Sequence, residues 1–213
     1  SSTPLRDWFY VIFLFSVAKN GVSAKEVERH LGVTYKTAWR IAKQVRTLMQ
    51  QGNNPLSGVV ETDETYIGGQ QRGKDITVQD KAVVFGMVER GGNVKAQHVR
   101  SAGARVLLPI LQSSIEPETV IYSDQARVYR TLHRIGYYHD SVNHSIGEYG
   151  RGIVHTNTIE GFWSQLKRSV DGTYHCVSRK YLQLYLNEFV YRYNHRTVPV
   201  FPILIASAAQ RVR

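Results

Sequence analysis

The order of apolar and polar positions divides the chain into three segments. In residues 1–56, and again from about residue 156 onward, apolar side chains recur at steps of three and four residues, which is typical of helices. Between these segments, short apolar runs bounded by turn residues indicate β-strands. The pattern predicts an α/β protein in which helices precede and follow a sheet.

The first helix is expected over residues 8–18, where the sequence is almost continuously apolar. This run is roughly half as long as a membrane-spanning helix, which needs ~20 residues. Arg6 and Asp7 cancel in charge ahead of it and no small-residue cleavage site follows, so the run is not typical of a signal peptide. We expect a buried helix of a soluble, cytoplasmic protein without a membrane segment.

Two more helices are expected before residue 50. Ser23 and Glu26 form a capping-box pattern for a short helix, and Thr34 can cap a longer helix through about Met49. Gly32 lies in the turn between them, which completes a helix-turn-helix pattern. This pattern favours DNA binding, and a plain helical hairpin with a solvated basic face is the alternative. The core face of the longer helix is formed by Ala38, Ile41, Ala42, Val45 and Leu48. The basic residues expected off this face are Lys36, Arg40, Lys43 and Arg46.

The middle segment contains most of the expected sheet. Strands are predicted at residues 58–66, 82–89, 93–99, 119–123 and 137–142. Helices are predicted at residues 104–115, where Pro109 can introduce a kink, and from about 126 to 135. Three strands, a helix, a strand, a helix and a strand imply a mixed sheet flanked by helices.

Two helices are predicted in the last segment. The helix at 156–170 has an apolar face formed by Ile159, Phe162, Trp163, Leu166 and Val170. A second helix, capped by Ser178, is expected to run to about Asn194. Three domains follow from this division: a helix-turn-helix module at 1–56, a catalytic domain at 57–196 and a tail at 197–213.

Charge and composition narrow the function classes. Apolar residues make up 42% and charged residues 21% of the sequence, which excludes disorder and fibrous repeats. The formal net charge of +10 divides into +5 for residues 1–56, −1 for 57–150 and +6 for 151–213, so the basic ends favour a polyanionic partner. The single cysteine, Cys176, excludes an internal disulfide or a zinc site built from several cysteines, and we expect it to be a small buried residue.

Three acidic residues, Asp63, Asp124 and Glu160, stand at positions where catalytic carboxylates are found. Glu61 and Asp63 share one face of the first strand, and Glu64 points to the other. Asp124 ends an apolar strand, and Glu160 lies near the start of a packed helix. Carboxylates brought together in this way favour divalent cations and phosphoryl transfer. Spacing alone equally allows three unrelated surface acids.

Four strings of residues add to this pattern. The strings ETDETYIGG (61–69), YSDQARVY (122–129), HTNTIEGFWSQLKR (155–168) and GTYHCVSRKYLQLYLNEFVYRYN (172–194) closely resemble bacterial insertion-sequence transposases. The group is the one related to the eukaryotic Merlin transposons, and the resemblance covers roughly residues 6–196. Transposases of this group usually begin with a Cys-rich zinc ribbon, which a sequence with one cysteine cannot contain.

The resemblance implies a ribonuclease-H-like DDE catalytic domain. Asp63, Asp124 and Glu160 would be its triad and would bind two Mg²⁺ or Mn²⁺ ions. Such enzymes cut double-stranded DNA at transposon ends, and the freed 3′-hydroxyl attacks target DNA. The resemblance also implies a homodimer or a larger assembly on DNA. A non-catalytic DNA-binding regulator and a ribonuclease-H-like structure-specific nuclease are the alternatives.

The expected DNA contacts come from the basic segments and from the string around Glu160. The candidates are Lys36, Arg40, Lys43, Arg46, His155, Asn157, Lys167, Arg168, Arg179 and Lys180. His155 could instead be a hydrogen bonder at the start of its helix. Arg179 and Lys180 could instead belong to a solvated face.

Overall fold

The computed structural model describes residues 3–52, 54–68, 81–124, 127–142 and 150–210 of the chain. Gly69 and Ala126, which belong to two of the quoted strings, lie outside these residues. The chain forms two compact units. One is made of residues 1–51 and 168–213, and the other of residues 52–167.

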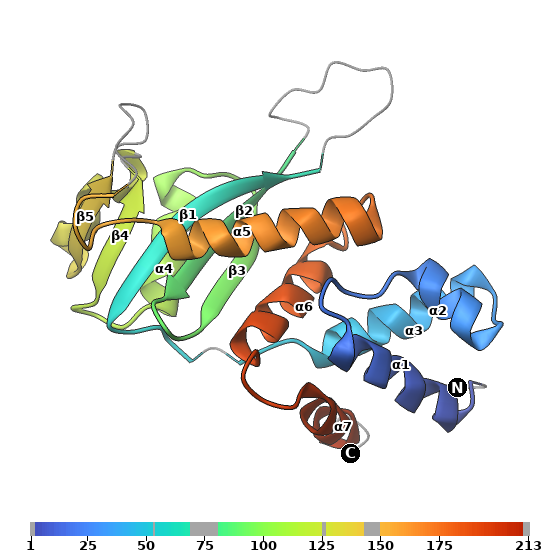
Figure 1. The fold of residues 1–213 in the computed structure, drawn as a ribbon. Coiled ribbons are helices and arrows are strands. Elements are labelled where there is room, and N and C mark those ends of the chain that lie inside the picture. Colours follow the sequence, from blue (N-terminus) through green and yellow to red (C-terminus); the bar gives the residue numbers. More distant parts are fainter. Residues whose placement is uncertain (1–2, 53, 69–80, 125–126, 143–149, 211–213) are drawn as a thin grey trace, which may run out of the picture. The chain divides into compact units, whose positions relative to one another are not determined.

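The unit of residues 52–167 contains a five-stranded mixed sheet (Figure 1). Its strands are β1 (Val59–Ile67), β2 (Ala82–Glu89), β3 (Val94–Val99), β4 (Val120–Asp124) and β5 (Tyr138–Val142). They lie in the order β3-β2-β1-β4-β5, with β1, β2 and β3 antiparallel and β1, β4 and β5 parallel. This is a ribonuclease-H-like arrangement, as expected, and every strand begins and ends within one residue of its predicted bounds.

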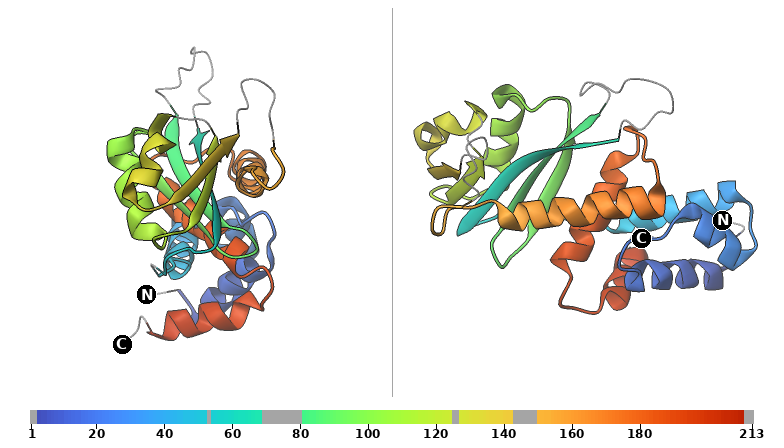
Figure 2. Two further views of the ribbon diagram at one scale, coloured as in Figure 1. Left: turned by 90° about the vertical axis from the view of Figure 1, so that its left-hand side faces the viewer. Right: turned by 45° about the horizontal axis from the view of Figure 1, so that its top comes forward.

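Helices cover both faces of this sheet (Figure 2). On one face, α4 (Ala104–Ser114) and the 3₁₀ helix η2 (Arg127–Ile135) pack on a core that includes Val60 and Phe85. On the other face lies α5 (Asn157–Ser169). The helix α4 continues through Pro109. The second helix of this layer was expected as an ordinary helix and is instead the tighter 3₁₀ form.

The other unit is helical. It contains α1 (Leu5–Val17), α2 (Ala24–Leu31), α3 (Tyr35–Leu48), α6 (Leu182–Asn194) and α7 (Val200–Gln210). The helix-turn-helix signals are confirmed. The Ser23 hydroxyl accepts a hydrogen bond from the Glu26 N–H at 3.1 Å, the Thr34 hydroxyl accepts one from Thr37, and Gly32 ends α2 with a left-handed φ of 64°.

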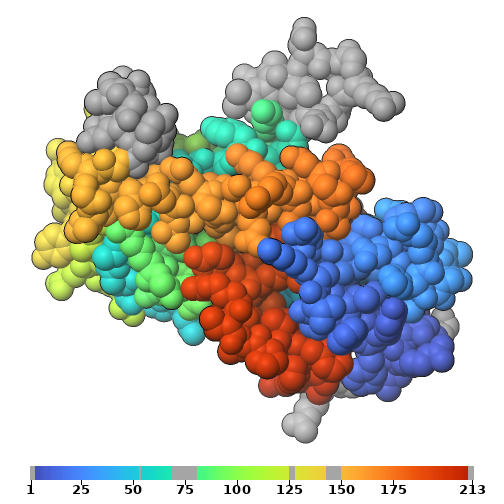
Figure 3. All heavy atoms as spheres, viewed as in Figure 1, coloured from blue at the N-terminus to red at the C-terminus, as the bar shows by residue number. Residues whose placement is uncertain are grey.

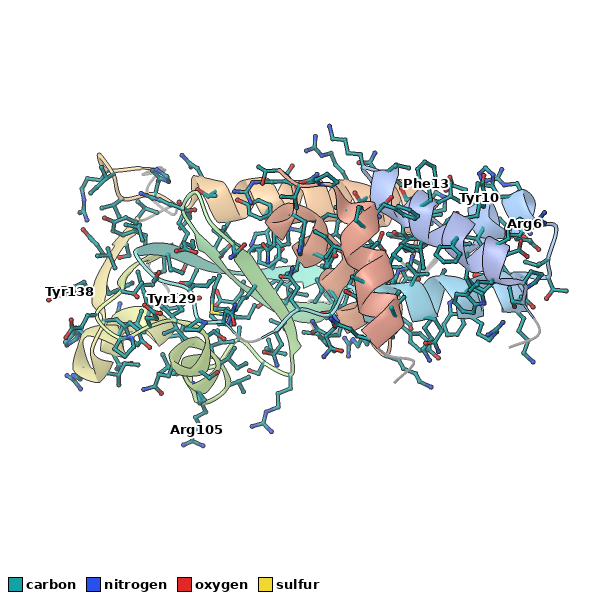
Figure 4. The ribbon with its side chains drawn as sticks, turned by 90° about the horizontal axis from the view of Figure 1, so that it is seen from below. Arg6, Tyr10, Phe13, Arg105, Tyr129 and Tyr138 are labelled. Carbon is teal, nitrogen blue, oxygen red and sulfur yellow. The ribbon has the colours of Figure 1, made fainter. Side chains whose placement is uncertain are left out.

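The first helix is buried on one side only. Val11 and Phe15 are buried, whereas Phe9 and Phe13 are 41% and 46% exposed, and Figure 4 shows Phe13 on the outside of α1. The first helix is thus part of the core, as expected, but its outer side is exposed. No helix within the described ranges combines the length and the apolar character that crossing a membrane requires.

The C-terminal helices belong to the same core as the N-terminal ones. Tyr191 of α6 and Leu204 of α7 are buried in one cluster with Val11, Phe15 and Ile41. Residues 168–196 therefore pack with the helix-turn-helix module rather than with the sheet, and residues 200–210 form a packed helix rather than a tail. Apolar burial makes the difference, because these faces are covered only when both ends of the chain come together.

Two local expectations in this region are corrected, and one element is present that was not predicted. The helix expected from Ser178 begins at Leu182 and has no side-chain cap. The helix α5 is followed by a π-helical turn, η4 (Val170–Tyr174). Cys176, expected to be buried, is exposed.

Candidate active site

Strand β1 presents its carboxylates to two different layers, as the alternation of its residues predicts. Asp63 accepts a hydrogen bond from the Trp163 indole N–H at 3.0 Å, on the face covered by α5. Glu64 accepts one from the Tyr129 hydroxyl at 2.5 Å on the opposite face, where Figure 4 shows Tyr129 beside the sheet. The strand therefore separates two neighbouring acids into two environments.

Asp63 and Asp124 lie on adjacent parallel strands. Glu61 pairs with Tyr122, so the same register continued by two residues brings Asp63 level with Asp124. Burial, then the charge of Asp124 and, more weakly, that of Glu160 together raise the pKa of Asp63 to about 6, against the hydrogen bonds from the Glu64 backbone and Trp163. Asp124 and Glu160 are therefore both within electrostatic reach of Asp63.

Trp163 reaches Asp63 because the strand beside β1 has no side chain at the contact. Gly86 of β2 lies opposite Asp63, and a Cβ at Gly86 would come within 2.3 Å of the Trp163 ring. The sequence pattern predicted only that Trp163 lies on the apolar face of its helix. Its hydrogen bond to Asp63 was missed, because the facing glycine is distant in the sequence.

The donor set fits a divalent cation chemically. Carboxylate oxygens are the preferred ligands of Mg²⁺, and a cation between Asp63 and Asp124 would remove the repulsion that raises the pKa of Asp63. The positions of these side chains fit a bound ion less well than their chemistry does. Over the described residues, no three His, Cys, Asp or Glu side chains lie close enough together to hold one ion. The Glu160 carboxylate accepts a hydrogen bond from the Thr156 hydroxyl at 2.7 Å, at the first turn of its own helix.

Glu61 is fully buried and its oxygens are occupied by the protein. It accepts hydrogen bonds from Arg90 Nε at 2.7 Å, from the Thr158 N–H at 2.8 Å and hydroxyl at 2.9 Å, and from the Ile159 N–H at 3.0 Å. Although Glu61 shares a strand face with Asp63, it is therefore not available to a metal ion. This network was also missed, since no sequence spacing connects Glu61 with Arg90 or with the start of α5.

A comparison with protein families decides which family the chain represents. A profile described as the ISXO2-like transposase domain matches residues 55–194, well over half of the chain. The chain belongs to the ISXO2-like transposases. Members of this DDE family generally use divalent metal ions, in agreement with the acidic character of the site.

Relatives of the ISXO2-like transposase occur in distant organisms. A protein of the transposable element ISH50 from Halobacterium salinarum is 26% identical over 210 residues, which cover 90% of this chain and 70% of that protein. A transposase-like protein from Haemophilus influenzae is 29% identical over 105 residues, which cover 49% of this chain and 81% of that protein.

Two solved structures show weaker similarity to the transposase. A chain of the simian T-cell lymphotropic virus intasome in complex with PP2A regulatory subunit B56 gamma gives a TM-score of 0.40 at 12% identity, covering 84% of this chain and 66% of that chain. The Mos1 transposase paired-end complex with left transposon end gives 0.36 at 11% identity, covering 97% and 80%. Similarities at this level carry no argument about this chain.

In the transposase, the residues expected to contact DNA near Glu160 fall into two groups. Arg90 Nη2 donates to the His155 carbonyl at 2.9 Å and lies 3.0 Å from its Nδ1, so His155 is part of the network at the start of α5. Asn157, Lys167 and Arg168 are exposed on α5, whose outer side lies on the surface in Figure 3.

The remaining basic candidates lie on the helical unit of the transposase. Lys36, Arg40, Arg179 and Lys180 are exposed. Lys43 is half-buried, with its ammonium group 5.5 Å from the Trp39 ring and 5.4 Å from the Tyr181 ring.

Arg46 does not belong to this set. Its side chain is buried, its Nε lies 2.8 Å from a Glu188 oxygen, and its Nη2 donates to the Val22 carbonyl at 3.0 Å. Burial is the largest single effect and lowers the pKa of Arg46, but the Glu188 carboxylate together with Tyr174 and Tyr185 outweighs it, so the pKa lies above its ordinary value. The prediction that Arg46 lies off the core face was wrong, because an acid from α6 makes a buried arginine favourable there.

Proposed function

We propose that the chain is an insertion-sequence transposase that cleaves double-stranded DNA at transposon ends and joins the freed 3′-hydroxyl to target DNA. The observation that carries the proposal is that Asp124 and Glu160 both lie within electrostatic reach of Asp63 in a member of a DDE family. We also propose that this transposase belongs to the group related to the Merlin transposons, as the four strings quoted above imply.

Asp63, Asp124 and Glu160 would hold two Mg²⁺ or Mn²⁺ ions in this enzyme. When bound, such ions supply Lewis-acid stabilisation of the attacking and leaving oxygens in phosphodiester chemistry. The protein contributes orientation. Trp163 fixes one oxygen of Asp63 and leaves the other free of that bond, and Thr156 holds Glu160 at the beginning of α5.

The DNA would be bound through its phosphates. The residues proposed for this role are the half-buried Lys43 and the exposed Lys36, Arg40, Asn157, Lys167, Arg168, Arg179 and Lys180. Lys36, Arg40 and Lys43 lie on α3, the second helix of a helix-turn-helix, which is the element that enters the major groove in such motifs. We further propose that two or more copies assemble on the DNA ends.

The test is a nicking and strand-transfer assay in Mg²⁺ or Mn²⁺. Its substrate is the DNA that flanks the coding sequence, which contains the element's own ends. We expect Asp63→Asn, Asp124→Asn and Glu160→Gln each to abolish nicking and joining while DNA affinity stays within a few-fold of wild type. Asp140→Asn is the matched control, because Asp140 pairs with Arg151 at the surface, where both side chains are about half exposed.

Two outcomes would contradict the proposal. Nicking that survives all three substitutions would show that the triad is not the catalytic centre. Sequence-selective binding by the wild type with no nicking or joining in either metal would favour a DNA-binding regulator.

A further inference from the structure

The catalytic helix α5 is attached to the sheet at its first turn. The N–H groups at the beginning of an α-helix have no partner within the helix. In α5, the N–H groups of Thr158 and Ile159 both donate to one oxygen of Glu61, a residue 97 and 98 positions earlier in the chain. The cap of this helix is therefore supplied by strand β1 and not by a neighbouring residue.

A single arginine completes the attachment. Arg90, directly after β2, donates to Glu61 at 2.7 Å and to the carbonyls of Ile153 and His155 at 2.7 Å and 2.9 Å. Its guanidinium also lies 4.8 Å from the centre of the Tyr122 ring. Arg90 thus binds both the strand carboxylate and the segment that leads into α5.

This arrangement is costly, which argues that it has a specific role. A fully buried carboxylate requires an opposite charge and several hydrogen bonds, and apolar residues of similar size often give equal or greater stability. Glu61 lies two residues before Asp63, and Thr158 lies two residues before Glu160. The ion pair of the buried Glu61 and the partly exposed Arg90 therefore lies close in the chain to two triad carboxylates.

We propose that Glu61 and Arg90 are positioning residues that set where Glu160 stands relative to Asp63. The inference rests on the proposed function, because it concerns the site formed by these two carboxylates. Asp63 is placed directly by β1, and Glu160 is placed by the same strand through Glu61 and the first turn of α5. Glu61 acts through the helix and not as a metal ligand, since its oxygens already accept four hydrogen bonds.

The experiment compares Glu61→Gln, Arg90→Gln and the double variant in the full chain, with Asp140→Asn as control. Each single variant leaves one partner of a partly buried ion pair without the other, so it is expected to lower the melting temperature. The double variant removes both charges and is expected to recover much of that loss. It therefore separates a defect in positioning from a defect in folding.

Two measurements report on positioning. Amide hydrogen exchange at residues 158–160 is expected to rise in Glu61→Gln and in the double variant, but not in Asp140→Asn. Calorimetric titration with Mn²⁺ is expected to give about 10–100-fold weaker binding in the double variant, the range typical of residues that orient metal ligands. The Mn²⁺ concentration for half-maximal nicking is expected to rise in parallel.

The outcomes separate the inference from the proposed function. Wild-type Mn²⁺ affinity in a folded double variant would overturn the positioning role, as would unchanged exchange at residues 158–160. A wild-type protein that neither binds Mn²⁺ nor nicks DNA would instead refute the proposed function, and the inference with it.

Discussion

Single residues determine the electrostatics of the triad. Asp63 keeps a carboxylate partly buried beside Asp124, which raises its pKa to about 6 from the ordinary value of 3.8. The acid is therefore ionised near pH 7 under conditions that disfavour its charge. Such a site costs stability unless a cation is bound.

Asp63→Asn is expected to raise the melting temperature of the metal-free protein at pH 7–8. The amide removes the charge and still offers an oxygen to Trp163. Because the folded-state pKa lies above the unfolded-state value, ionisation destabilises wild type above pH 6, and this cost disappears as the pH falls from 6 to 4. A gain of ~1 kcal/mol would raise the melting temperature by about 2–4 °C.

Thermal melts in a chelating buffer at pH 4 and pH 8 check this prediction. The difference between variant and wild type is expected at pH 8 and should vanish near pH 4. Added Mn²⁺ should stabilise wild type more than the variant. A variant that melts below wild type at pH 8 would show that the ionised carboxylate does not cost stability there.

For single residues, the sequence predicted the direction of a side chain better than it predicted the hydrogen-bond or ion-pair partner of that side chain. The alternation along β1 correctly separated Asp63 from Glu64, because side-chain direction in a strand depends only on the backbone. The partners of Glu61 and Arg46 were not predicted. They come from positions 97 and 142 residues away, and no local pattern records such distances.

At the scale of elements, the helix α3 has basic side chains both at the surface and in the core. In α3, Lys36 is exposed, whereas Arg46 is enclosed by the rings of Tyr174 and Tyr185 and by the carboxylate of Glu188. The same helix therefore carries one cation at the surface and another within its own packing.

Arg46→Ala is expected to destabilise the protein by about 3 kcal/mol, the lower end of the range for breaking a buried ion pair. Glu188 would lose one partner but keep Arg192, whose Nη2 lies 2.8 Å from it, so the loss should stay near that lower end. Lys36→Ala, the matched change on the same helix, should alter stability by no more than ~0.5 kcal/mol.

Urea unfolding of the two variants measures this contrast. The DNA affinity of the folded variants is the second measurement. Lys36→Ala should weaken DNA binding although it changes stability only slightly. Equal destabilisation by both substitutions would contradict the buried role of Arg46.

The bounds of the strands could be predicted from the sequence, whereas the type and the packing of some helices could not. Strands were predicted to within one residue, because apolar runs bounded by turn residues define them locally. The 3₁₀ form of η2 was not, since apolar positions at steps of three and four residues are compatible with either kind of helix in so short a segment. The packing of α6 and α7 was also not predicted, because an amphipathic pattern gives a buried face without naming its partner.

The whole molecule carries a net charge of +10, and this charge should govern how it binds DNA. Each phosphate that a lysine or arginine neutralises releases counterions, so affinity falls as salt rises. Lys36→Ala and Lys180→Ala should each reduce the slope of log affinity against log salt concentration by about 1.

Fluorescence anisotropy with a mixed-sequence DNA duplex at several salt concentrations measures these slopes. Asp140→Asn is the control, because it changes charge at a surface position on the sheet. Slopes that stay at the wild-type value in both lysine variants would exclude these residues from phosphate contact.

The division of the chain into units has a practical consequence for truncation. Residues 52–167 are inserted between the two parts of the helical unit, so the polypeptide crosses from one unit to the other twice. A fragment trimmed to the matched range 55–194 would keep Glu188 and Arg192 in α6 but lose Arg46, leaving a buried acid without one of its two counterions. Likewise, a protease that cuts once near residue 52 leaves the two units covalently joined through residues 167 and 168.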